Sequence, residues 1–104
     1  MFECLELAHE TARTIAPLVD SIERRDRSMA DQLRRAFTSI VSNLDEGAGH
    51  RGAERANHYR VALGSTREVS SQLRLALAWR YVDNIDAALA LLDRLRAMLW
   101  RLTH

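Results

Sequence analysis

Apolar residues recur at steps of three and four along almost the whole chain, and this spacing constrains the fold more than any other feature. Residues three and four positions apart lie on one face of an α-helix, so each run predicts a helix with one apolar face. Only one proline and four glycines interrupt the 104 residues, too few for a protein built from many turns. The sequence therefore predicts an all-α fold.

Four runs of this kind can be distinguished, and the first is expected to form a helix over about residues 2–24. The predicted core faces, from the first helix to the fourth, are Leu5, Ala8, Ala12, Ile15, Val19 and Ile22; Met29, Leu33, Ala36, Phe37, Ile40 and Leu44; Tyr59, Ala62, Leu63, Thr66, Val69, Leu73 and Leu77; and Ile85, Ala88, Leu92, Leu95, Leu99 and Leu102. Asp83 and Asn84 break the pattern before the fourth helix and can cap it.

The predicted helix ends carry residue types that satisfy free backbone groups. Asp26 or Ser28 can accept hydrogen bonds from the first amides of the second helix. Gly47 and Gly49 can end that helix in a left-handed cap, and the third helix is expected to start after Gly52. Because short connections make neighbouring helices antiparallel, we predict an antiparallel up-and-down four-helix bundle, with residues 1–104 as one domain.

Charge and cysteine content exclude several classes of protein. The formal net charge is +1, so the molecule as a whole makes no strong field for nucleic acid or acidic membrane, although all 15 cationic side chains are arginine. Cys4 is the sole cysteine, which rules out a disulfide within the chain and indicates a packed thiol. The start of the chain lacks the features of a signal peptide, and no apolar run approaches the roughly 20 residues of a membrane span. We therefore expect a cytoplasmic protein without membrane contact.

Part of the apolar surface lies outside the predicted core. On the third helix, the side away from the core carries Val61, Gly64, Leu75 and Trp79, mixed with Glu68. The fourth helix carries Leu89 and Trp100 outside its predicted core face. Grouping on one helix face favours an interface, so we predict a homo-oligomer that uses this face of the third helix.

Several motifs together resemble the bacterial four helix bundle protein family, also called the S23 ribosomal or intervening-sequence protein family, whose members are encoded within insertions of 23S rRNA genes. The motifs are Gln32-Leu33-Arg34-Arg35-Ala36, Ser39-Ile40, Ser42-Asn43-Leu44-Asp45-Glu46-Gly47, and Tyr59-Arg60-Val61-Ala62-Leu63-Gly64-Ser65 followed by Glu68. The resemblance implies an antiparallel four-helix bundle, often assembled into a homopentameric ring, with no established catalytic activity. It also implies a distant relation to the accessory protein of diversity-generating retroelements, a basic pentamer that binds a reverse transcriptase and nucleic acid. Asp45 in place of a usual alanine, and the nearly neutral charge, argue against transferring nucleic-acid binding.

A strip of polar residues follows one edge of the second helix core and coincides with the family motif. Its members are Gln32, Arg35, Ser39, Asn43 and Glu46. Asn43 is expected to lie nearly inside the core, where an unbonded amide costs about 1–3 kcal/mol. We interpret the strip as structural, fixing helix register and assembly, in preference to a ligand site.

Two further motifs contain residue types that are found at phosphate sites or metal sites. Gly47, Gly49 and Gly52 spell G-x-G-x-x-G, but a helix and not a strand precedes them, so a turn explains them better than a phosphate site. Glu46, His50, Glu54 and His58 recur every four residues and would form a metal face on an unbroken helix, which the glycines interrupt. His9 and His104 are isolated, and no nucleophile has a base beside it, so we predict no catalytic residue, no metal, no cofactor and no enzyme.

Arg60, Arg67 and Arg74 recur every seven residues and so form one stripe on the third helix. Such a stripe could follow a phosphate backbone, or it could be a solvated face balanced by acidic residues of the first and third helices. Two functions therefore stay open from the sequence. One is a scaffold or adaptor whose ring presents surfaces to a protein partner, and the other is an accessory protein that binds RNA or DNA through the arginine stripe.

Overall fold

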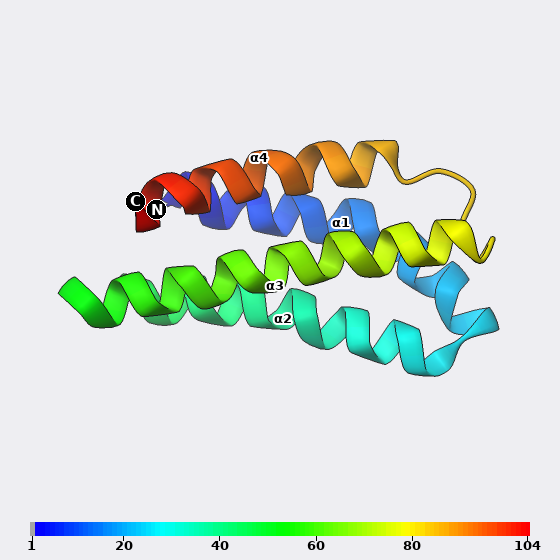
Figure 1. Ribbon diagram of the computed structural model, residues 1–104, viewed down its shortest axis with the longest axis horizontal. Coiled ribbons are helices and arrows are strands. Elements are labelled where there is room, and N and C mark those ends of the chain that lie inside the picture. Colours follow the sequence, from blue (N-terminus) through cyan, green and yellow to red (C-terminus); the bar gives the residue numbers. More distant parts are fainter. Residues whose placement is uncertain (1) are drawn as a thin grey trace.

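The computed structural model describes residues 2–104, and these residues form four α-helices without a strand. The helices are α1 (Phe2–Arg25), α2 (Arg27–Ala48), α3 (Gly52–Ala78) and α4 (Asp86–Thr103). Each helix packs on its neighbours in chain order, and α4 closes the bundle against α1 (Figure 1). This arrangement confirms the predicted all-α, antiparallel up-and-down four-helix bundle. The bundle measures 42 × 23 × 19 Å. None of the described helices is both long enough and apolar enough to span a membrane.

The core consists of the predicted apolar faces with a few shifts. Leu77 and Leu102 were expected inside but are each 39% exposed, and Leu5 and Ala12 are only half-buried. In α3 the buried series continues from Leu73 to Ala76, because a helix needs steps of three as well as four to keep its 3.6-residue period facing the core. Further buried residues that the sequence pattern did not predict are Leu7, Thr11, Ala30, Ala76 and Val82.

Two polar side chains inside the core have their hydrogen bonds satisfied locally. The Thr11 hydroxyl donates to the carbonyl oxygen of Leu7 at 2.7 Å, and the Thr66 hydroxyl donates to that of Ala62 at 2.8 Å. Cys4 is fully buried and makes no disulfide, as expected. Among the described residues, no buried side-chain polar atom is left without a partner.

The helix ends differ from the sequence-based expectation at the glycines. Asp26 caps α2 as predicted, since its carboxylate accepts the Met29 amide at 3.0 Å. The left-handed cap at Gly47 and Gly49 is wrong: Gly47 lies inside α2, and Gly49 has φ of −86°. The glycine with positive φ is Gly52, at +60°, where α3 begins.

The end of α3 uses an arginine where a glycine would be usual. Arg80 has φ of 65°, and the Tyr81 amide reaches back to the Ala76 carbonyl oxygen at 2.9 Å, which closes the helix in a left-handed cap. Ser21 on α1 donates a hydrogen bond to the Tyr81 carbonyl oxygen at 2.7 Å. The connection between α3 and α4 is thus fastened to α1. Asn84 Oδ1 then accepts the Asp86 amide at 2.8 Å just before α4, whose N-cap position is Ile85.

Candidate functional site

A row of polar side chains joins α2 to α3, and we call it the polar seam: Gln32, Ser39 and Asn43 of α2 with His58, Ser65 and Gln72 of α3. Gln72 donates to Gln32 Oε1 at 3.1 Å, and Ser65 donates to Ser39 Oγ at 2.9 Å. Asn43 Oδ1 and His58 Nδ1 lie 2.9 Å apart. The order of the pairs is that of two antiparallel helices, so the seam fixes the register of α2 against α3.

The polar strip predicted on α2 therefore lies largely at this seam. Three of its residues bond across to α3, whereas Arg35 is exposed and makes no hydrogen bond or ion pair with the described residues. The α3 half of the seam was missed by sequence reasoning. Its signal is present, since His58, Ser65 and Gln72 recur every seven residues, but it acquires meaning only opposite α2.

Asn43 is the most constrained residue of the seam. Its amide group donates to the Ser39 carbonyl oxygen at 2.8 Å and to Ser39 Oγ at 3.2 Å, which turns its Oδ1 toward His58. These bonds all lie within one chain. They support a role in holding α2 and α3 together, and its role in assembly between subunits stays a prediction.

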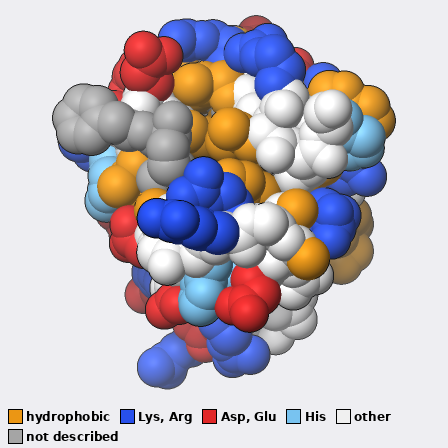
Figure 2. Space-filling view, turned by 90° about the vertical axis from the view of Figure 1, so that its left-hand side faces the viewer, with side chains coloured by type: hydrophobic (Ala, Val, Ile, Leu, Met, Phe, Trp, Pro, Cys, Tyr) orange, Lys and Arg blue, Asp and Glu red, His pale blue; other side chains and the backbone are white. Residues whose placement is uncertain are grey.

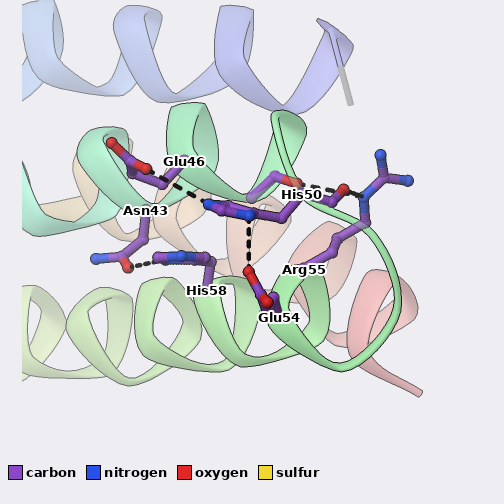
Figure 3. A network of polar contacts seen from close by, with 7 residues as sticks. Asn43, Glu46, His50, Glu54, Arg55 and His58 are labelled. Carbon is purple, nitrogen blue, oxygen red and sulfur yellow. Dashed lines mark hydrogen bonds and ion pairs between the residues drawn. The ribbon is translucent and has the colours of Figure 1, made fainter.

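The seam ends in a group of titratable side chains at the α2–α3 connection, which we call the histidine cluster: Glu46, His50, Glu54 and His58 (Figure 3). His50 Nδ1 lies 2.8 Å from Glu54 Oε2, and His50 Nε2 lies 3.8 Å from Glu46 Oε2. The rings of His50 and His58 are stacked, with centroids 5.2 Å apart and planes 18° from parallel. One ligand-type atom from each of Glu46, His50 and His58 lies within 4.8 Å of the others.

The glycines interrupt the helix as predicted, but the interruption does not keep these residues apart. α2 ends at Ala48 and α3 begins at Gly52, so the chain folds back on itself and returns His58 beside the last turn of α2. Arg55 holds the connection, because its Nε donates to the carbonyl oxygens of His50 at 2.9 Å and Gly47 at 3.2 Å. Proximity here comes from the helical hairpin and not from the four-residue spacing along one helix.

The predicted interface residues lie on the surface. Val61, Leu75 and Trp79 are 43%, 40% and 54% exposed, and Gly64 is exposed between them on the outer face of α3. Trp100 on α4 is 47% exposed and stacks on His104. The Trp79 ring makes an edge contact with Tyr81, with centroids 5.8 Å apart.

The predicted arginine stripe is also exposed. Arg60, Arg67 and Arg74 lie on the flank of α3 opposite to the one that carries the polar seam. Within residues 2–104 they form no ion pair closer than 4.0 Å, so the balancing contacts considered from the sequence are not made there.

Figure 2 shows the end of the bundle where α1 begins and α4 ends. Acidic and basic side chains lie close together on this end, around a hydrophobic area.

Comparison with known proteins assigns the chain to a family. The family model described as 23S rRNA-intervening sequence protein matches residues 1–101. The chain belongs to this family. A crystal structure of a protein of unknown function from the S23 ribosomal protein family of Bacteroides thetaiotaomicron VPI-5482 is similar to it, with a TM-score of 0.86 and 20% sequence identity, covering 96% of this chain and 97% of that chain. This similarity confirms the bundle fold. No curated protein matches the chain.

In this member of the 23S rRNA-intervening sequence protein family, the motifs that carried the resemblance contribute Gln32, Ser39, Asn43 and Ser65 to the polar seam. Asp45 is exposed on α2 and makes no ion pair with the described residues. The G-x-G-x-x-G sequence spans the end of α2 and the start of α3, with no strand beside it. A helical hairpin therefore accounts for its glycines.

The bundle also carries a groove that sequence reasoning missed. It lies between α1 and α2, and its volume is about 290 Å³. The apolar part of its lining is Ala12, Ile15, Ala16, Val19, Leu33 and Phe37. Asp20 and Arg34 also line it. The signal in the sequence is the pair of alanines four residues apart on α1, whose small side chains leave space opposite Phe37.

Proposed function

We propose that this protein is a non-enzymatic, oligomeric scaffold or adaptor whose assembled bundle presents surfaces to a protein partner. The observation that carries the proposal is the exposed outer side of α3, which carries Val61, Gly64 and Leu75 along its length and Trp79 directly after its end. We expect it to act in the cytoplasm, because its one cysteine is a free, buried thiol.

The chemistry of this face favours an interface over scattered surface residues. Tryptophan is enriched among the residues that dominate binding energy at protein interfaces. The Trp79 ring packs edge-on against Tyr81, and this contact limits the side-chain freedom that binding would remove. Burying apolar surface contributes about 25 cal/mol for each Å² removed from water.

Two different apolar surfaces on the bundle support a ring over a simple dimer. The apolar groove lies between α1 and α2, whereas the exposed apolar face belongs to α3. Two different surfaces that pair head to tail generate a closed ring when the rotation between subunits closes. The homopentamer implied by the family resemblance is an assembly of this kind, and we propose it for this chain.

Multi-angle light scattering after gel filtration tests the assembly, at tens of micromolar chain. We expect a mass several times the 11.9 kDa of one chain. Trp79→Glu should convert the oligomer to monomer, because it places a charge in the proposed interface. Trp100→Glu is the matched control: it changes an exposed tryptophan on α4 and should leave the mass unchanged. A monomeric wild type would end the oligomer proposal, and an unchanged mass for Trp79→Glu would end the role of the α3 face.

The alternative function is nucleic-acid binding through the arginine stripe. The observation that favours it is that Arg60, Arg67 and Arg74 are exposed in one row, with members about 10 Å apart along the axis. Ring assembly would repeat this row around the particle. Each phosphate contact releases condensed counterions, so three contacts predict a slope of log affinity against log salt of about −2 to −3.

Fluorescence anisotropy with labelled single-stranded and structured RNA and DNA distinguishes the two functions. If the stripe binds, changing its three arginines to glutamine should abolish salt-sensitive binding. The matched control changes Arg24, Arg27 and Arg51 to glutamine, which removes the same charge from exposed positions outside the stripe. Equal loss in both variants would indicate general charge attraction, and absence of binding by the wild type would leave the protein-scaffold function.

A further inference from the structure

We propose that Glu46, His50 and His58 form a binding site for one divalent metal ion of the zinc type, with Asn43 and Glu54 as positioning residues. The site closes the end of the α2–α3 hairpin. It is independent of the scaffold and nucleic-acid proposals, because none of its residues belongs to the α3 apolar face or the arginine stripe.

The distances suit a metal ion after a small movement. Ligand atoms of Glu46, His50 and His58 lie within 4.8 Å of one another. Zinc binds nitrogen and oxygen at about 2.0–2.2 Å in tetrahedral geometry, which places ligand atoms roughly 3.3–3.5 Å apart. The Glu46 side chain is 64% exposed and is therefore free to rotate toward the histidines. The rings of His50 and His58 are stacked, so at least one of them must also turn before both can direct a nitrogen at one ion.

The hydrogen bonds of Asn43 prepare His58 to bind a metal. Because the Asn43 amide nitrogen donates to Ser39, its Oδ1 is the atom that faces His58 Nδ1. An oxygen of an amide can only accept, so Nδ1 carries the proton and Nε2 keeps a free lone pair. Second-shell partners of this kind select the tautomer and ring orientation of metal-binding histidines.

His50 is prepared in the same way by a carboxylate. Its Nδ1 lies 2.8 Å from Glu54 Oε2, so the neutral ring donates through Nδ1 and leaves Nε2 with a lone pair. That Nε2 faces Glu46, whose Oε2 lies 3.8 Å away (Figure 3). Arg55 holds the His50 backbone through its carbonyl oxygen. The arrangement is the carboxylate–histidine pair that commonly supports a metal ion.

The ligand types decide which metal fits. Two imidazoles and one carboxylate suit zinc and neighbouring transition metals, whereas magnesium and calcium prefer shells made of oxygen alone. Three protein ligands leave one tetrahedral position for water or a fourth ligand. Bound metal would tie the last turn of α2 to α3. The competing account is that His50, when protonated, forms ion pairs with Glu46 and Glu54 and binds no metal.

Isothermal titration of the untagged, chelator-treated protein with ZnCl₂ tests the site. We expect one Zn²⁺ per chain, and His50→Ala and His58→Ala should each weaken binding at least about tenfold. His9→Ala is the matched control, since His9 is exposed on α1 outside the cluster and its loss should not change affinity. Circular dichroism confirms that the variants remain helical. A dissociation constant weaker than about 1 mM, or equal binding by all three variants, would overturn the proposal.

Replacing Zn²⁺ with Co²⁺ tests the positioning residues, because the absorption spectrum of bound Co²⁺ responds to the ligand geometry and not to the stability of the fold. The visible absorption of bound Co²⁺ reports ligand number and geometry, and we expect a tetrahedral spectrum that His58→Ala abolishes. Asn43→Leu should alter the spectrum and weaken binding about tenfold. Glu54→Gln keeps an oxygen that can accept from Nδ1, so it should bind better than Glu54→Ala. If these two Glu54 variants bind alike, or if Co²⁺ keeps an octahedral aqua-type spectrum, the proposed site is wrong.

Discussion

Replacing Gly47 with alanine places a methyl group against a buried ring. A Cβ atom at Gly47 would lie 2.5 Å from Tyr59 Cε1 and 2.9 Å from Cδ1. Carbon atoms in ordinary contact are 3.5–4.0 Å apart, so the ring must move by about 1 Å. Tyr59 is only 2% exposed and is surrounded by packed side chains, which leave little space for that movement. We therefore expect Gly47→Ala to lower stability.

The magnitude follows from two opposing effects. Forcing an extra carbon into a packed core costs about 1–3 kcal/mol. Alanine in place of glycine inside a helix contributes up to about 1 kcal/mol, and less here because Gly47 lies next to the last residue of α2. The expected net loss is about 1–2 kcal/mol. Gly49→Ala is the matched control outside the proposed interface: its added carbon meets only the Glu46 carbonyl oxygen at 3.6 Å, an ordinary contact, and its φ of −86° suits alanine, so stability should change by no more than about 0.5 kcal/mol.

Urea denaturation followed by circular dichroism measures both variants at one chain concentration, since oligomerisation links stability to concentration. Thermal melting should show the same order, with shifts of roughly 4–8 °C for each kcal/mol. A double-mutant cycle identifies the cause, because in a Tyr59→Leu background the ring is gone and Gly47→Ala should become neutral or stabilising. If Gly47→Ala costs the same in that background, or destabilises no more than Gly49→Ala, the reasoning from the ring contact fails.

Two further predictions concern Asn43 and Cys4. Asn43→Leu should keep the helix content but lower the unfolding free energy by about 1–3 kcal/mol, because His58 Nδ1 loses its acceptor in a half-buried site; an unchanged urea midpoint would contradict this. Burial raises the pKa of the Cys4 thiol, so the folded state favours the neutral thiol. Stability should then be complete below the ordinary thiol pKa of about 8.5 and fall as pH rises toward the folded pKa. Cys4→Ala should lack this fall in a urea series from pH 7 to 10, and equal slopes in both proteins would refute the assignment.

The positions and faces of the helices could be predicted from the sequence because they depend on local spacing. The core residues predicted on α2 are all buried, and the Asp26 cap was predicted as well, since both depend on residues within one or two turns. The exposed row Val61, Leu75 and Trp79 was found in the same way. A 3.6-residue period and the needs of free backbone amides act wherever the residues occur in a chain.

Features at helix ends and between helices could not be predicted in this way. Gly47 lies inside α2 with the Tyr59 ring packed where a side chain would be, and Arg80 takes the left-handed conformation that the sequence would assign to a glycine. Leu77 has an apolar side chain but lies outside the core, because Ala76 takes the inward position at the end of α3. Each outcome depends on a neighbour that is distant in sequence or on a shift of one residue in phase.

The candidate metal site shows the same division. The sequence by itself determined that Glu46, His50 and His58 lie around the glycine-containing turn between the second and third helices, and it determined the polar strip along α2. Only the tertiary structure decided that α3 returns antiparallel to α2, which sets His58 against Asn43 and both histidines beside Glu46. The physical reason is that the tautomer and the direction of an imidazole depend on hydrogen-bond partners contributed by the facing helix, and those partners are fixed by packing and not by spacing along the chain.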